Sequence, residues 1–313
     1  MKFQTIFKTH VNCATESEIF QHFQSTLTDS INLWNYFVDW QKVLRNFHQI
    51  EINLNTLNYL VGKDNIEQEF RQLLQHYPQI IHAIPILIAC RTSSFQILTD
   101  YPNGSLSYKN FNLTTKKLKN RTSLTEADID DIVEFVKNTG ILDLFKNKTI
   151  KSIPDYVLGI EVGLDSNGRK NRGGKTMETI VENLISTICQ ENNFLFMSQA
   201  TSQKIQAEWN IHVQVDKSSR RFDFAIKNQT SLYLVEANFY GGGGSKLKAT
   251  AGEYKTLFDL ISRQGHKFIW ITDGLGWKTT LRPLEETFQY IDYTLNLNMA
   301  GSGLLAELIK QNL

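Results

Sequence analysis

The sequence predicts an α/β protein, in which a mixed β-sheet core flanked by helices occupies residues 151–313 and follows a mainly helical region in residues 1–150. Two observations predict this fold. Apolar residues recur at three- and four-residue steps from about Ser17 to Cys90, which is typical of helices. Beyond Pro154, helical patterns alternate with short β-branched and aromatic runs, which is typical of an α/β domain. The boundary is expected near Lys146 to Lys151.

Two segments complete the first region. Residues 101–122 alternate in short runs around a Pro-Asn-Gly turn signal, which predicts a hairpin or an extended excursion. Ser123 to Thr125 then precede an apolar helical pattern. That order predicts a capped helix that ends near Gly140.

The second region alternates helices and strands. The runs Arg221–Ile226 and Leu232–Asn238 predict two strands, and the short polar connection between them predicts antiparallel pairing. An amphipathic helix is expected from Gly174 to Gln190. The other expected elements are a strand within 193–198, a helix from about Ala249 to Arg263, a strand at Lys267–Thr272 and a helix opened by Pro283.

The composition is that of an ordinary folded chain. The 313 residues include 33 lysines and arginines against 32 acidic residues, a formal net charge of +1. Because this bulk charge is near zero, any contact with nucleic acid must come from a local basic surface. Cys13, Cys90 and Cys189 lie far apart and form no CxxC pair, which argues against a disulfide framework or a structural zinc site. These features favour the reducing cytoplasm.

No segment is expected to enter a membrane. The N-terminal segment has no long apolar core and no small-residue cleavage site, so it does not predict a signal peptide. The longest apolar stretch, from Ile80 to Cys90, is about half the roughly 20 residues that a membrane-spanning helix requires. We expect this stretch to be buried core.

The two paired strands carry the residues that point to chemistry. Side chains alternate across a strand, so Glu236 and Asn238 share one face, and Asp223 can face Glu236 across the pair. With the backbone carbonyl of Ala237, the two carboxylates make the oxygen-rich site that Mg²⁺ prefers. A metal there can polarise a phosphodiester oxygen and lower the pKa of an attacking water. The constellation predicts a Mg²⁺-dependent nuclease.

Spacing alone leaves a structural alternative open. In that alternative, Asp223 and Glu236 are carboxylates at strand ends that pair with Arg220 and Arg221. A third acid from the preceding helix would favour the metal site, and Glu178 is our candidate, with Glu182 as a substitute. The alternative for this helix is a solvated face that carries two like charges one turn apart.

Basic residues gather in three runs near the carboxylates and can contact DNA phosphates beside the cut site, although a charged run can also be plain solvated surface. The glycines after the second strand let backbone amides approach a phosphate closely. They do not form a nucleotide-binding P-loop, because Ser245 precedes Lys246 and Leu247 follows it. The expected DNA contacts are Arg169, Lys170, Arg172, Lys175, Arg220, Arg221, Gly242, Gly243, Ser245, Lys248 and Lys278.

The spacing D-x12-E-x-N resembles the active site of PD-(D/E)xK nucleases, whose usual last member is a lysine that positions or helps to deprotonate the attacking water. Asn238 stands at that position here. Asparagine can hydrogen-bond a water but carries no positive charge and is no base near neutral pH. Lys246, beyond the glycine run, is our candidate catalytic substitute.

Four blocks in order resemble the DpnII/MboI family of type II restriction endonucleases over about Asp155 to Leu281: GLDSNGRKNRGGKTMETIVENLI, SSRRFDFAI, LYLVEANFYGGGGSKL and FIWITDGLGWKTT. The resemblance implies a restriction-endonuclease-like fold. It also implies cleavage of both strands at the palindrome GATC, 5′ of the G with a 5′ overhang, dependence on Mg²⁺, and inhibition by adenine methylation. The catalytic positions would be Asp223 and Glu236, with Asn238 at the usual lysine position.

The resemblance further implies partners. A two-fold-symmetric duplex target suggests a homodimer in which each subunit cuts one strand. A cognate adenine DNA methyltransferase would protect host DNA. Candidate base-reading segments are Ser166–Arg172 and Trp277–Arg282, although Trp277 can equally be packed as core. The competing functions are a structure-guided or repair nuclease of the same fold and a catalytically inactive DNA-binding protein.

Overall fold

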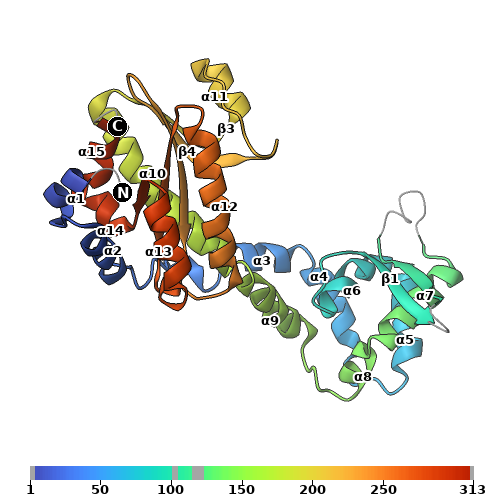
Figure 1. The fold of residues 1–313 in the computed structure, drawn as a ribbon. Coiled ribbons are helices and arrows are strands. Elements are labelled where there is room, and N and C mark those ends of the chain that lie inside the picture. The colour runs from blue at the N-terminus through green and yellow to red at the C-terminus, as the bar shows by residue number, and fades with distance from the viewer. Residues whose placement is uncertain (1–3, 101–104, 115–122, 311–313) are drawn as a thin grey trace. The chain divides into compact units, whose positions relative to one another are not determined.

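The computed structural model describes residues 4–100, 105–114 and 123–310. They form two compact units (Figure 1): the sheet unit, residues 1–33 and 170–313, and the helical unit, residues 34–169. This division differs from the boundary expected near residue 150. The N-terminal residues join the α/β core, and the helix α9 (Ile153–Ser166) belongs to the helical unit.

A five-stranded mixed sheet in the order β3-β4-β5-β6-β7 forms the centre of the sheet unit. The expected antiparallel pairing of the second and third strands is confirmed, whereas the last three strands run parallel. The fifth strand was missed by the sequence reasoning because it has only three residues. The strands are β3 (Leu195–Thr201), β4 (Arg221–Lys227), β5 (Leu232–Phe239), β6 (Lys267–Asp273) and β7 (Tyr293–Leu295).

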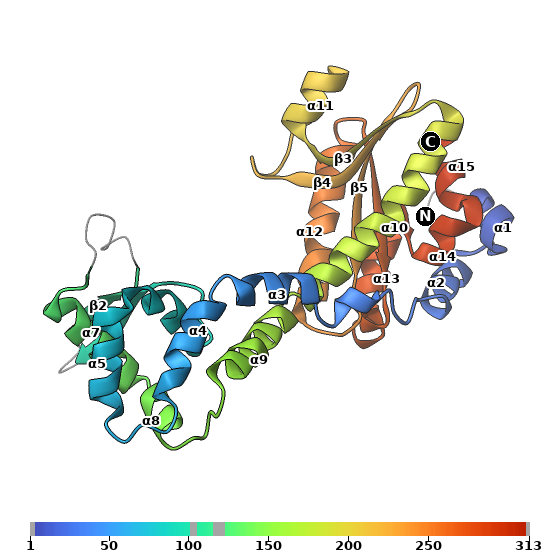
Figure 2. The same cartoon turned by 180° about the vertical axis from the view of Figure 1, so that it is seen from behind.

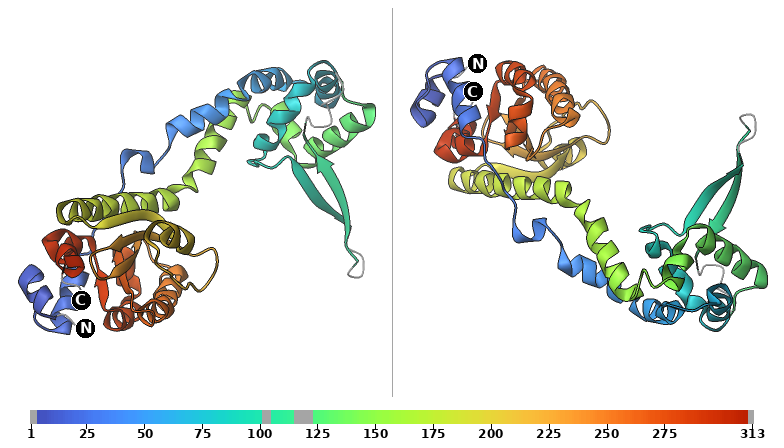
Figure 3. Two further views of the ribbon diagram at one scale, coloured as in Figure 1. Left: turned by 90° about the horizontal axis from the view of Figure 1, so that it is seen from above. Right: turned by 90° about the horizontal axis from the view of Figure 1, so that it is seen from below.

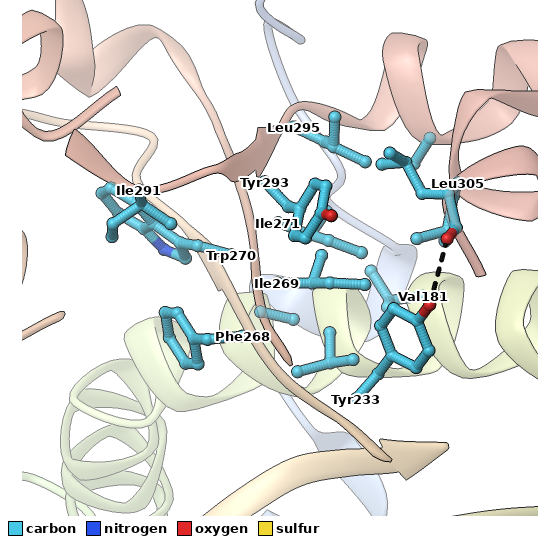
Figure 4. Packing of buried hydrophobic residues seen from close by; sticks show 14 of the residues in the cluster. Val181, Tyr233, Phe268, Ile269, Trp270, Ile271, Ile291, Tyr293, Leu295 and Leu305 are labelled. Carbon is cyan, nitrogen blue, oxygen red and sulfur yellow. Dashed lines mark hydrogen bonds between the residues drawn. The ribbon is translucent and has the colours of Figure 1, made fainter. Parts of the chain in front are cut away.

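Helices cover both faces of this sheet. Figure 3 shows α10 along one face and the pair α12 and α13 on the other. On the side of α15, the hydroxyl of Tyr233 donates to the backbone oxygen of Leu308 at 3.3 Å, a bond drawn in Figure 4. These helices of the sheet unit are α10 (Arg169–Asn192), α11 (Ser202–Trp209), α12 (Ser245–Ser262), α13 (Leu281–Tyr290), α14 (Leu297–Met299) and α15 (Leu305–Lys310), with a 3-10 turn at Leu275–Thr279 and a π-helical turn at Ala300–Leu304.

The N-terminal helices α1 (Gln4–Val11) and α2 (Glu16–Ser25) pack beside the C-terminal helices of the same unit (Figure 2). They bury Phe7 and Phe23 in the core of the sheet unit. Asp273, at the end of β6, accepts hydrogen bonds from the backbone N–H and the hydroxyl of Thr28, at 2.7 and 3.0 Å. Helical periodicity predicts that these segments bury one face, but it does not say against which partner.

The helical unit has an apolar core of its own and a two-stranded antiparallel hairpin. The expected capped helix is confirmed, since Thr125 and Asp128 form a capping box. The hairpin is formed by strands on either side of the Pro-Asn-Gly signal, and residues 101–104 and 115–122 lie outside the described residues. Besides α9, the helical unit contains α3 (Trp40–His48), α4 (Glu51–Leu57), α5 (Ile66–His76), α6 (Ile84–Leu87), the hairpin strands β1 (Ser94–Asp100) and β2 (Ser107–Asn112), α7 (Glu126–Asn138) and α8 (Ile141–Lys146), with 3-10 turns at Trp34–Tyr36, Asn58–Leu60 and Pro78–Ala83.

The long apolar stretch from Ile80 to Cys90 lies within this helical core. Ile80, Ile84 and Leu87 are each at most 2% exposed. The expectation of buried core is therefore confirmed for the apolar residues from Ile80 to Leu87, whereas His82 and Ala89 are exposed. Across the described part of the chain, no helix combines the length and the apolarity needed to cross a bilayer.

Candidate active site

The strands β4 and β5 separate at the point where their carboxylates lie. Their ladder ends at the pair Phe224 and Val235, so the next facing positions are Asp223 and Glu236. The backbone N–H of Ala237 donates to Oδ2 of Asp223 at 2.8 Å. The side chain of Asp223 thus takes over a donor at the place where the strands part, and the two carboxyl groups lie side by side.

Glu236 is buried, with 6% of its surface exposed. Its Oε2 accepts a hydrogen bond from the hydroxyl of Tyr254 at 3.1 Å. Its Oε1 is also buried and has no hydrogen-bond partner among the described residues. A buried acceptor without a donor is costly and calls for a missing partner such as an ion or a water.

The surroundings of the pair raise the pKa of both carboxyl groups. Burial raises the pKa of Glu236 to about 8, and the neighbouring charge of Asp223 adds to the shift. Burial likewise raises the pKa of Asp223 to about 6, with a further contribution from Glu178. A nearby cation would oppose both shifts, because opposite charge stabilises ionised carboxylates.

Asn238, at the position usually held by lysine, is fixed by two aromatic residues. Its Oδ1 accepts a hydrogen bond from Nε1 of Trp270 at 2.6 Å, and its Nδ2 donates to the hydroxyl of Tyr254 at 3.1 Å. These bonds orient the amide and leave one N–H of Nδ2 outside them. Asn238 therefore holds a donor toward its surroundings but no basic group.

Glu178 lies on α10, and its charge reaches Asp223. Its Oε2 accepts a hydrogen bond from the side-chain amide of Gln199 at 3.1 Å. The register places Gln199 between the pairs Ser198–Phe224 and Ala200–Phe222, level with Asp223. Gln199 has a left-handed backbone with φ of 50°, which is strained for a residue with a side chain and is common at functional sites.

These residues fit a hard divalent cation. Asp223 and Glu236 offer carboxylate oxygens, and Oε1 of Glu236 is available because no described residue donates to it. Among the described residues, no group of three or more His, Cys, Asp or Glu side chains is close enough to hold a metal. A cation held here would take two carboxylates and oxygens from backbone or water, a donor set that would suit Mg²⁺ better than a softer metal.

The sequence predicts Arg220 as a DNA contact, but in the structure this residue is buried. Its guanidinium donates to both carboxylate oxygens of Asp216, at 2.8 and 2.7 Å, and to Glu253 at 2.7 Å. Its side chain is only 8% exposed. The hydrogen bonds of the Arg220 guanidinium thus go to Asp216 and Glu253, although its charge also acts to lower the pKa of Glu236.

The other expected DNA contacts have three locations. Arg169, Arg172 and Lys175 lie at the start of α10, where Nε of Arg169 donates to the backbone oxygen of Phe37 at 3.2 Å; the side chain of Lys170 lies outside the described residues. Arg221 is exposed at the start of β4. The exposed residues around the glycine run are Gly242, Gly243, Ser245, Lys246, Lys248 and, on the adjacent 3-10 turn, Lys278.

The third and fourth sequence blocks that resemble the DpnII/MboI family contact each other in the structure. The N–H of Gly276 donates to the backbone oxygen of Tyr240 at 2.7 Å, and a Cβ at Gly276 would lie 2.4 Å from the backbone oxygen of Gly242. Trp277 is buried, and its Nε1 donates to Thr272 at 2.9 Å. The core alternative for Trp277 is therefore confirmed.

Comparison with known proteins assigns the family. A protein-family model described as DpnII restriction endonuclease matches residues 19–307, which is most of the chain. The chain belongs to the DpnII restriction endonuclease family. The resemblance and the fold class expected from the sequence are thereby confirmed.

Named members of the DpnII family match along nearly the whole chain. The type II restriction enzyme MjaIII of Methanocaldococcus jannaschii is 46% identical, over 93% of this chain and 99% of its own length. The type II restriction enzyme DpnII of Streptococcus pneumoniae is 36% identical, over 92% of this chain and 98% of its own. The type II restriction enzyme MboI of Moraxella bovis is 34% identical, over 89% and 92%. No solved structure matches the chain.

Three residues of this DpnII-family site were missed by the sequence reasoning: Tyr254, Trp270 and Gln199. Tyr254 lies within the expected helix and Trp270 within an expected strand, where an aromatic residue indicates packing rather than chemistry. Gln199 lies in an ordinary strand pattern. The available signal was the period of the elements, which predicts a shared face but not a hydrogen bond across elements.

Proposed function

We propose that this restriction endonuclease hydrolyses both strands of double-stranded DNA at GATC, 5′ of the G, with Mg²⁺ held by Asp223, Glu236 and the backbone oxygen of Ala237. The observation that carries the metal site is the pair of facing carboxylates at the diverging ends of β4 and β5, of which Glu236 is buried and has one oxygen that lacks a donor among the described residues. The target sequence rests on the resemblance to the DpnII/MboI family and on family membership.

The residues of the site have separate tasks in this proposal. When bound, Mg²⁺ polarises the phosphodiester and offsets charge in the five-coordinate transition state. Asp223 and Glu236 hold the cation in their ionised forms, and the hydrogen bond from Ala237 fixes the orientation of Asp223. Glu178, anchored by Gln199, adds a third acidic group on the side of α10.

Activation of the attacking water depends on groups other than a lysine at position 238. Asn238 can position a water through the N–H that its two aromatic neighbours leave outside their bonds. Lys246, exposed in the first turn of α12, is the proposed cationic substitute. Replacing Lys246 by Met should slow single-turnover cleavage, and an unchanged rate would remove this residue from the mechanism.

DNA contact is proposed for the residues at the start of α10 and β4 and around the glycine run rather than for Arg220. Phosphate contacts give affinity without sequence preference, so these residues should position the duplex over the carboxylates. The palindromic target suggests a homodimer with one carboxylate pair per strand. The proposed contacts are Arg169, Lys170, Arg172, Lys175, Arg221, Gly242, Gly243, Ser245, Lys248 and Lys278.

Protection from self-digestion follows from the same target. We propose that methylation of the adenine in GATC blocks cleavage and that a cognate adenine DNA methyltransferase supplies this protection. A methyl group on the adenine amine lies in the major groove, where it removes a donor and adds bulk. Base contacts there would therefore be lost on the methylated site.

One digestion tests the proposal. Plasmid DNA without adenine methylation, incubated with the protein and Mg²⁺, should give discrete fragments with 5′-GATC ends, and adenine-methylated plasmid should stay intact. The Asp223→Asn variant should bind the same DNA and leave it uncut. A smear would instead indicate a structure-guided or repair nuclease, intact unmethylated DNA would indicate an inactive DNA-binding protein, and full activity of Asp223→Asn would overturn the site.

A further inference from the structure

We propose that Tyr254 is a positioning residue that orients both Glu236 and Asn238 in the nuclease site; this inference rests on the proposed function. A single hydroxyl group, carried on α12, contacts both strand residues. Tyr254 is itself only 6% exposed. It therefore lies behind the strand residues rather than on the surface that DNA would meet.

The direction of the hydrogen bonds is fixed by the donors available. The hydroxyl of Tyr254 has one proton, and Nδ2 of Asn238 can only donate, so the hydroxyl accepts from Asn238 and donates to Oε2 of Glu236. Trp270 can also only donate, and it bonds Oδ1 of Asn238. With Glu236 in the ionised form that would hold a cation, the chain of bonds thus has one consistent arrangement, from Trp270 through Asn238 and Tyr254 to Glu236.

This arrangement selects one oxygen of Glu236 for the cation. Oε2 is held by the hydroxyl of Tyr254, whereas Oε1 is left without a partner among the described residues. Without the hydroxyl, the carboxyl group could turn and Asn238 would lose its hydrogen bond to α12. The groups that orient metal ligands in this way commonly change metal affinity or activity about 10–100-fold.

Packing holds the ring of Tyr254 in place independently of its hydroxyl. The ring meets Phe268 edge-on at 5.7 Å and Trp270 at 5.4 Å between centroids. Figure 4 shows Phe268 and Trp270 on the same face of β6. Replacing Tyr254 by Phe should therefore keep the packing and remove only the two hydrogen bonds.

The chain offers a matched control in Tyr240. Its hydroxyl donates to Thr250 of α12 at 3.0 Å, and its ring meets Trp277 edge-on. Within the described part of the chain, its hydroxyl makes no bond to Glu236 or Asn238. Tyr240→Phe thus removes one half-buried, hydrogen-bonded hydroxyl without touching the proposed metal ligands.

The test compares the full-length protein with Tyr254→Phe, Tyr240→Phe and Asp223→Asn. Mn²⁺ binding is followed by electron paramagnetic resonance, DNA affinity by fluorescence anisotropy without metal, and cleavage by single-turnover kinetics at saturating Mg²⁺. Tyr254→Phe should bind Mn²⁺ about 10-fold more weakly and cleave about 10–100-fold more slowly, with DNA affinity and melting temperature close to those of Tyr240→Phe. In protein that already carries Glu236→Gln, Tyr254→Phe should cause no further loss of Mn²⁺ binding.

Two outcomes separate this inference from the proposed function. If Tyr254→Phe binds Mn²⁺ and cleaves within twofold of Tyr240→Phe while Asp223→Asn is inactive, Tyr254 is merely structural and the nuclease site stands. If Asp223→Asn binds Mn²⁺ and cleaves like the parent, the proposed function itself fails.

The hairpin of β1 and β2 has an exposed face that the proposed function has not used. We infer that this outward face of the β1–β2 ribbon contacts base edges of the DNA substrate. This second inference also rests on the proposed function. The register pairs Gln96 with Asn110 and Leu98 with Tyr108. All four side chains are exposed, and Leu98 and Tyr108 keep 44% and 48% of their surface. The opposite face is occupied, since Phe95 and Phe111 pack on Phe135 of α7.

The shape of the ribbon, its paired amides and the absence of carboxylates on its outward positions favour duplex DNA as the occupant of this face. A two-stranded ribbon fits the major groove, and paired amide side chains match the edge of adenine. The outward positions of the paired register, Ser94, Gln96, Leu98, Tyr108, Asn110 and Asn112, include no carboxylate.

Anisotropy with two labelled duplexes tests this surface. The duplexes differ only in containing GATC or a scrambled site, and Ca²⁺ replaces Mg²⁺ to prevent cleavage. The double variant Gln96→Ala/Asn110→Ala should bind the GATC duplex at least 10-fold more weakly and the scrambled duplex within twofold of the parent. The control Asn55→Ala/Gln79→Ala changes two exposed amides elsewhere in the helical unit and should bind both duplexes like the parent.

An equal loss on both duplexes, or no loss on either, would overturn base contact by the ribbon. If the parent protein itself did not prefer the GATC duplex, the proposed target would fail instead.

Discussion

Oδ2 of Asp223 accepts the backbone N–H of Ala237 at 2.8 Å, at the position where the ladder between β4 and β5 ends. This bond lets the two strands part without leaving the N–H of Ala237 unpaired. It also holds the half-buried carboxyl group of Asp223 beside the buried carboxyl group of Glu236. Two ionised carboxylates this close repel each other, and a bound cation would relieve this repulsion.

Ionisation of these two carboxyl groups should make the free energy of unfolding depend on pH in the absence of metal. Burial raises the pKa of Glu236 to about 8 and that of Asp223 to about 6. A raised carboxyl pKa in the folded state gives stability at low pH that is lost as pH rises through the folded pKa. We expect Glu236→Gln to exceed the parent in unfolding free energy by about 2 kcal/mol at pH 8.5 and to match it near pH 4.5. Urea titrations in chelator check this, and parallel pH curves for parent and variant would contradict it.

Gln199 should trade stability against activity. Its left-handed backbone is strained, and its amide anchors Glu178. Gln199→Gly relieves the strain, so the unfolding free energy should stay the same or rise by about 1 kcal/mol. Cleavage should fall about 10-fold because Glu178 loses its donor. Gln206→Gly, within α11, should do the reverse by lowering stability and sparing cleavage. A destabilised but fully active Gln199→Gly variant would refute the assignment.

Arg220 and its neighbour Arg221 should separate structure from DNA contact. The guanidinium of Arg220 is buried between Asp216 and Glu253, whereas Arg221 is exposed. Arg220→Met should lower the unfolding free energy by about 1–3 kcal/mol, since its partly exposed carboxylate partners lose their cation. Arg221→Met should leave stability unchanged and reduce the slope of log affinity for DNA against log salt by about 1. A reduced salt slope in Arg220→Met at unchanged melting temperature would show that Arg220 contacts DNA after all.

Asp273 should contribute to stability rather than to cleavage, although it lies at the end of β6, next to the strand β5 that carries Glu236. Its carboxylate accepts four hydrogen bonds, from the N–H and hydroxyl of Thr28 and the N–H groups of Gly274 and Leu297. Asp273→Asn sets an amide N–H against these donors and should cost about 3 kcal/mol in chemical denaturation. Asp29→Asn, an exposed neighbour of Thr28, should cost less than about 0.5 kcal/mol. Equal stability of the two variants would show that the network does not hold the N-terminal segment.

Local patterns were sufficient for most elements of the sheet unit. The strands β4 and β5 and the helix α12 were predicted because each buries a face with the period of its own geometry. The division into two units differs from the expected boundary because residues 1–33 are separated along the sequence from the core that they join by the whole helical unit. Helical periodicity is the same whichever partner the apolar face meets, so only the folded chain reveals that Phe7 and Phe23 belong with the sheet.

The candidate site divides in the same way. Alternation along two adjacent strands was enough to predict that Asp223 and Glu236 face each other, and the four sequence blocks were enough to predict the family. The tertiary structure alone decided that Arg220 is withdrawn into ion pairs and that Asn238 is held between Trp270 and Tyr254. The physical reason is range: side-chain direction follows from the residue's own strand, whereas a hydrogen-bond partner is set by which distant element packs above it.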